Sequence, residues 1–267
     1  MSKLSEQVQN QIEVSERVVA SARARAKKVA VELTARAAQA QEADAAATPA
    51  EYEAVVLLLA AQLTRAAEAL RARELEVTAE QADDGPVRAA RDAAEREVTS
   101  LMARLRSTVE DALGPDALAT YGLQGETPRG PAKVLSYSWN AAQLLRKTPA
   151  SIMTELGSTF STQAAALAVE ARHATLDALI KDDAREAREL EGALTNRDRA
   201  AETWSDVYLG AATALEGLYR LAGWPELADR VRPTERTLRG EDAGPEIEEG
   251  GAEGGGAEGG AAGGHVT

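Results

Sequence analysis

Apolar residues return at steps of three and four along several Ala-rich stretches of this chain. The first stretch shows the pattern in full, with Leu4, Val8, Ile12, Val18, Ala22, Ala26, Val29, Leu33 and Ala37. This spacing follows the 3.6-residue turn, so it predicts an amphipathic helix over 4–41 with one buried face. At 1.5 Å per residue the helix would be roughly 55 Å long, which is typical of an elongated bundle.

Two further helices are predicted in the first half. Thr48, Pro49 and Glu51 form a helix-start signal, with Thr48 as N-cap and Glu51 completing a capping box. The helix that follows has an apolar face made of Tyr52, Val55, Val56, Leu59, Leu63, Ala66, Leu70 and Val77. Asp83-Asp84-Gly85-Pro86 predicts a turn, and a third helix then continues to a stop at Gly114-Pro115.

The second half begins after a connector rich in Gly and Pro over 122–131. A short helix is expected over 133–146, and a longer one from about Ser151, with Ile152, Leu156, Phe160, Leu167, Ala171, Ala174 and Ala178 on one face. A loop or kink over 192–196 separates it from a last helix over 197–222. Gly223 is expected to cap that helix while Trp224 folds back on its last turn.

These elements predict an all-α fold of about six helices, arranged as elongated antiparallel bundles. The expected organisation is an N-terminal half over 1–123, a connector over 124–131, a C-terminal half over 132–239 and a disordered acidic Gly-rich tail over 240–267. We expect truncation at Arg239 to leave folding unchanged, because the tail lacks core-forming residues.

The two halves are weakly alike. Arg91-Asp92 and Arg197-Asp198 each open an acidic, Ala-rich helical stretch that ends in a stop containing Gly and Pro, at Gly114-Pro115 and at Gly223-Trp224-Pro225. Two interpretations stay open: a duplicated helical unit, or a likeness that Ala-rich composition produces by itself.

Composition supports the helical interpretation and excludes several chemistries. Apolar residues make up 44% of the chain but aromatic residues only 3%, so Ala, Leu and Val must fill the core. There is no cysteine, which excludes disulfides, thiolate metal sites and cysteine nucleophiles. No phosphate-cradling Gly-rich loop or Gly-x-Ser-x-Gly motif occurs.

Charge and hydropathy bear on location and partners. The net charge is −13, which disfavours nucleic-acid binding because an acidic surface repels phosphates. The basic cluster from Arg23 to Lys28 is spread around its predicted helix. The longest apolar run, from Ala54 to Ala61, is far shorter than the ~20 residues that a membrane span needs, and the N-terminus lacks signal-peptide features. We therefore expect a cytoplasmic protein without a membrane partner.

Two histidines limit the candidate metal chemistry. Glu170 and His173 lie at i and i+3, the spacing that carboxylate-bridged di-metal bundles use twice. One chain supplies one such pair, so a centre would need a homodimer. A partly exposed helical histidine one step off the buried face is the simpler interpretation, and we expect no cofactor.

Aromatic residues are concentrated in the second half. Trp204 and Tyr208 are one helical turn apart, and Trp224 follows the predicted cap. They either fill space between the halves or bind a partner, since Trp and Tyr are typical interface anchors. The favoured function is accordingly a non-enzymatic scaffold or protein-interaction protein, possibly a homodimer. The alternatives are a di-metal carboxylate protein and, third, a pore-forming or membrane-remodelling helical protein.

Overall fold

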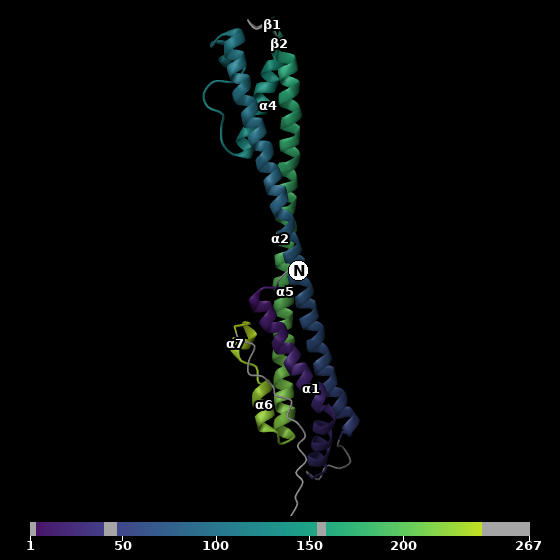
Figure 1. The fold of residues 1–267 in the computed structure, drawn as a ribbon. Helices are drawn as coiled ribbons and strands as arrows, with labels where there is room; N and C mark the ends of the chain where they lie inside the picture. The colour runs from purple at the N-terminus through teal and green to yellow at the C-terminus, as the bar shows by residue number, and fades with distance from the viewer. Residues whose placement is uncertain (1–3, 40–46, 154–158, 242–267) are drawn as a thin grey trace, which may run out of the picture. The chain divides into compact units, whose positions relative to one another are not determined.

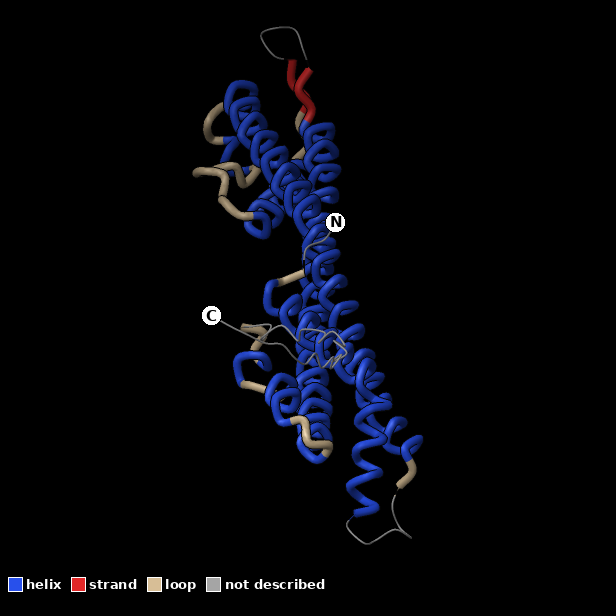
Figure 2. Tube along the Cα trace, turned by 60° about the horizontal axis from the view of Figure 1, so that its bottom comes forward, coloured by secondary structure: helices blue, strands red, loops and turns tan. Residues whose placement is uncertain are grey.

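The computed structural model describes residues 4–39, 47–153 and 159–241, and confirms an all-α fold (Figure 1). The described helices are α1 (Glu6–Gln39), α2 (Pro49–Leu113), α3 (Ala117–Thr120), α4 (Pro131–Lys147), α5 (Thr162–Leu221), α6 (Pro225–Val231) and α7 (Glu235–Leu238). The described strands, red in Figure 2, are β1 (Ser151–Met153) and β2 (Thr159–Ser161), which pair antiparallel with Ile152 opposite Phe160.

Several helix signals are confirmed. In α1 the buried apolar positions include Val8, Ile12, Val18, Ala22, Ala26, Val29 and Leu33. At the start of α2 the Thr48 amide donates to a Glu51 carboxylate oxygen at 2.7 Å, and the Glu51 amide donates to the Thr48 hydroxyl at 3.3 Å. This reciprocal pair is the predicted capping box.

The two predicted breaks inside the long helices are wrong. Helix α2 continues through Asp83-Asp84-Gly85-Pro86, and α5 continues through 192–196. Gly85 has no Cβ to clash with the ring of Pro86, so it tolerates the helical conformation before a proline better than other residues do. An ion pair between Arg88 and Asp84 (2.9 Å) also spans the proline. Local turn propensity is therefore overridden here by the flanking helix.

The expected helix start at Ser151 is also wrong. Residues 151–153 and 159–161 form the β1–β2 hairpin, and α5 begins at Thr162. The hydroxyl of Thr162 accepts from the Ala150 amide at 2.8 Å, which closes the base of the hairpin. The apolar face predicted for this helix was shifted: Leu167 is 59% exposed, whereas Ala166, Val169 and Leu176 are buried. Leu156 lies outside the described residues.

The chain folds into two compact units, and each of the two longest helices contributes residues to both. Unit 1 contains Ala69–Thr203 with residues 1–5, and unit 2 contains Glu6–Glu68 and Trp204–Thr267. The boundary at 68/69 falls inside α2 and the boundary at 203/204 falls inside α5. This grouping differs from the division expected at the 124–131 connector, because contacts between α2 and α5 join segments that are distant in sequence.

Each unit has its own core of small and aliphatic side chains. In unit 1 the core is formed by α2, α4 and α5, with the Ala94, Val98, Met102, Leu105, Val109, Val134, Ala141, Leu145, Ala166, Val169 and Leu176 side chains. In unit 2, α1 packs with the unit 2 parts of α2 and α5, where Val56, Leu63, Trp204, Tyr208, Leu215 and Tyr219 are buried.

The first two residues of the predicted tail, Gly240 and Glu241, are part of the described structure. Gly240 is buried, and its carbonyl oxygen accepts from the Asn10 side chain of α1 at 2.9 Å. The Glu241 amide donates to the Arg236 carbonyl at 3.0 Å. Residues 242–267, the remainder of the predicted disordered tail, lie outside the described residues.

Candidate functional site

The Glu170 and His173 pair lies in unit 1, on the side of α5 that faces α4. Arg146 of α4 donates to both carboxylate oxygens of Glu170 in a two-pronged ion pair. The Ser138 hydroxyl lies 3.2 Å from Nδ1 of His173, and the Trp139 ring centroid lies 5.1 Å from that of His173. Both members of the proposed metal pair therefore have interactions with α4.

His173 is partly exposed, as the sequence predicts, but it lies on the buried face of α5 and not one step off it. It lies four residues after buried Val169 and three before buried Leu176, so it shares their face, and its side chain is half-buried. An arginine bound to Glu170 also supplies the positive charge that a metal ion would otherwise provide. The metal assignment stays a prediction, and a metal would have to displace Arg146.

A second group of carboxylates lies elsewhere in unit 1. Glu80 of α2 and Glu186 and Glu189 of α5 place oxygens within 4.8 Å of one another. Arg185 contacts two of them, Glu186 at 3.1 Å and Glu189 at 3.8 Å. The cluster is thus partly neutralised within the chain, and it has no histidine.

The predicted aromatic pair of unit 2 is part of its core. Trp204 and Tyr208 are 0% and 1% exposed, and their rings stack with centroids 5.1 Å apart. The Trp204 indole donates to the Ser15 hydroxyl at 2.8 Å. Burial raises the pKa of Tyr208, and a hydrogen bond with Thr237 partly offsets this rise. Neither ring is available at the surface of this unit.

Trp224 differs from that pair because it is half-buried. Its amide donates to the Tyr219 carbonyl at 2.8 Å, and the Gly223 amide donates to the Arg220 carbonyl at 3.0 Å. These two bonds form a Schellman motif, with Gly223 at a φ of 86°. The Trp224 ring lies 6.5 Å from the Tyr219 ring, which confirms that it folds back on the last turn of α5.

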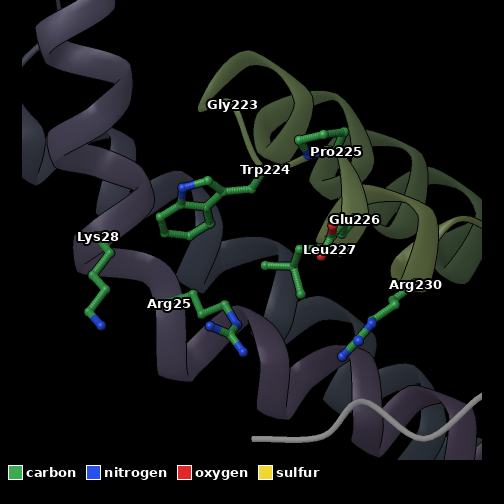
Figure 3. Close-up of a pocket in the computed structure, with 8 residues that line it drawn as sticks. All are labelled: Arg25, Lys28, Gly223, Trp224, Pro225, Glu226, Leu227 and Arg230. Carbon is green, nitrogen blue, oxygen red and sulfur yellow. The ribbon is translucent and has the colours of Figure 1, made fainter. Parts of the chain in front are cut away.

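A pocket of about 480 Å³ lies beside Trp224 within unit 2. Its lining comes from α1, from the two residues Gly223 and Trp224 between α5 and α6, and from α6, namely Arg25, Lys28, Gly223, Trp224, Pro225, Glu226, Leu227 and Arg230 (Figure 3). The basic cluster on the first helix is visible in the sequence, but its grouping with Trp224 and Arg230 is not. No sequence signal links α1 to Arg230, because packing alone brings these distant segments together.

An exposed apolar surface lies on the part of α2 that belongs to unit 2. Val55, Leu57 and Leu58 are 46%, 40% and 56% exposed, whereas Val56 and Ala60 are buried. The run from Ala54 to Ala61 is apolar around the whole helix, so it fills the core on one side and leaves aliphatic groups in water on the other.

Comparisons with known proteins give no function for this chain. No protein-family model matches it, and no match was found among the curated proteins or the solved structures. None of the helices in the described ranges has the length and apolar character that crossing a membrane requires.

Proposed function

We propose that this protein is a non-enzymatic helical scaffold that associates with a second copy of itself through α2. The observation that carries this proposal is the exposed aliphatic surface of Val55, Leu57 and Leu58. Contiguous exposed apolar side chains on a soluble protein commonly mark a protein-binding surface, because burying them removes apolar area from water.

The candidate polar sites of unit 1 support a scaffold over a metal enzyme. Glu170 is held by Arg146, and Nδ1 of His173 lies within hydrogen-bond distance of the Ser138 hydroxyl. Interactions of this kind fix helices to one another and leave fewer groups free for chemistry.

The residues along the exposed face of α2 favour a second copy as the occupant. Glu51, Val55, Leu58, Gln62 and Arg65 are all exposed and follow alternating steps of four and three, the spacing of a two-helix seam. In an antiparallel pair centred on Leu58, Glu51 lies opposite Arg65 of the partner subunit. A two-fold interface repeats this contact on both sides of the centre.

Light scattering on the purified full chain tests the proposal. We expect a dimer for the wild-type chain and a monomer for Leu58→Asp, because a carboxylate at the centre of the seam would be buried without a partner. Leu209→Asp is the matched control, since Leu209 is 47% exposed on α5 of the same unit. A wild-type monomer, or a Leu58→Asp chain that stays dimeric, would contradict the proposed interface.

The proposed pairing of Glu51 with Arg65 of the partner subunit is tested by the same light-scattering measurement. Arg65→Glu places like charges opposite each other and should weaken the dimer, whereas adding Glu51→Lys should restore it. Glu51→Lys alone also removes the capping interaction with Thr48, so its melting temperature is recorded as a folding control. A monomeric double variant would exclude the antiparallel register but leave the Leu58 test intact.

A further inference from the structure

We propose that the pocket beside Trp224 binds a small organic phosphate that carries a planar ring. This site is independent of the α2 surface proposed above. It lies wholly in unit 2, between α1 and the segment from Gly223 to Arg230.

Positive charge is concentrated in the pocket of an otherwise acidic protein. Arg25 and Lys28 come from α1 and Arg230 from α6, and the single acidic residue in the lining is Glu226. None of these three cations forms an ion pair within the part of the chain that the structure describes, whereas several arginines of unit 1 do. In Figure 3, Arg25 and Arg230 lie on either side of Leu227. Such a group of cations would attract an anion even though the net charge of the chain is −13.

Arg25 carries a second indication of a missing partner. Its Nε atom is buried and has no hydrogen-bond acceptor among the described residues. Buried donors are normally satisfied, because an unpaired one costs free energy comparable to a lost hydrogen bond. A phosphate oxygen is a suitable acceptor, since guanidinium groups bind phosphates through two parallel N–H donors.

The opposite wall of the pocket is preformed and apolar. Trp224 is fixed by its backbone bond to Tyr219 and by the contact between their rings, and Leu227 is buried next to it. Figure 3 shows the indole beside Arg25 on α1. A planar ring can stack on an indole while its phosphate reaches the cations. The volume of about 480 Å³ falls within the range of small-molecule sites.

Gly223 allows α1 to approach this wall closely. A Cβ at this position would lie 2.2 Å from Nη2 of Arg36, and the backbone φ of 86° also favours glycine. Arg36 therefore adds a fourth cation next to the Gly223 edge of the pocket.

Calorimetric titration of the full chain at low salt tests the site, with AMP, adenosine and inorganic phosphate as probes. We expect AMP to bind at least about tenfold more tightly than either adenosine or inorganic phosphate. Only AMP can stack a ring on the Trp224 indole and place a phosphate against the cations at the same time. Equal binding of AMP and inorganic phosphate would overturn the role of the indole. No binding of AMP at millimolar concentration would overturn the site.

Matched variants distinguish AMP binding in the pocket from nonspecific attraction to positive charge elsewhere on the surface. Lys28→Gln and Arg230→Gln should each weaken AMP binding several-fold or more, whereas Lys27→Gln and Arg232→Gln remove the same charges from exposed neighbours outside the lining. Trp224→Leu should weaken AMP but not inorganic phosphate. The melting temperature of each variant is recorded as a folding control. If pocket and control variants with wild-type melting temperatures lose the same amount of AMP affinity, the assignment is overturned.

Discussion

Two serine hydroxyls of α1 contact the polar atoms of buried aromatic side chains in the core of unit 2. Ser15 accepts from the Trp204 indole and donates to the Gln11 carbonyl, both at 2.8 Å. Ser21 lies 3.3 Å from the hydroxyl of Tyr219, which is 0% exposed. The sequence places these serines on the buried side of α1, but only the packing of α1 against α5 shows why polar residues are tolerated there.

Tyr219 should make the stability of unit 2 sensitive to alkaline pH. Burial raises its pKa, with smaller opposing effects from Ser21 and Arg25. Its stabilising contribution is therefore fully present below the unfolded-state pKa of about 10 and is lost as pH rises through the higher folded-state pKa. Tyr219→Phe should start less stable at pH 8 and approach the wild type by pH 11 in urea unfolding. A constant difference in unfolding free energy between these pH values would contradict this prediction.

At the scale of elements, the periodic pattern located the helices but misjudged their interruptions and one of their faces. Asp83-Asp84-Gly85-Pro86 and 192–196 contain ordinary breaker residues, yet both lie inside helices. Breakers change the local free energy by about 1 to 3 kcal/mol, which packing and ion pairs on both flanks can exceed. Arg91 of α2, for example, contacts Asp183 of α5 at 2.6 Å close to the proline.

Gly192→Ala should stabilise the protein by about 1 kcal/mol, since alanine is a better helix former than glycine. Gly192 is exposed inside α5, and an added Cβ would meet no atom within 4 Å. Gly223→Ala should instead destabilise the protein. Its positive φ disfavours alanine, and an added Cβ would clash with the Arg36 side chain. Chemical unfolding of the two variants checks both signs, and a loss of stability in Gly192→Ala would contradict the continuous helix.

At the scale of the whole molecule, the long helices make reciprocal contacts that bear on the possible duplication. Arg91 of α2 pairs with Asp183 of α5, and Arg197 of α5 pairs with Glu74 of α2 at 3.5 Å. These two arginines are the ones that align when the halves of the sequence are compared. The reciprocity supports the duplicated-unit interpretation, which stays a prediction.

Truncation tests whether the contact of Gly240 with α1 contributes to the melting temperature. A chain ending at Glu241 should keep the wild-type melting temperature, because Gly240 remains buried against α1. The hydrogen bond from Asn10 to Gly240 replaces the sequence-based expectation for truncation at Arg239: a chain ending there loses this bond and should melt lower by roughly a few degrees. Thermal unfolding followed by circular dichroism compares the two chains. Identical melting temperatures would show that the contact contributes nothing.

The sequence by itself determined the all-α class, the buried face of α1, the capping box at Thr48 and the Gly223 cap. These features depend on residues within a few turns of one another, so local spacing and backbone preference suffice to predict them. Tertiary structure decided the burial of Trp204, the ion pair of Glu170 with Arg146 and the convergence of Arg25 with Arg230. Each of these depends on contacts between segments distant in sequence, and helical periodicity does not specify which faces of two helices meet.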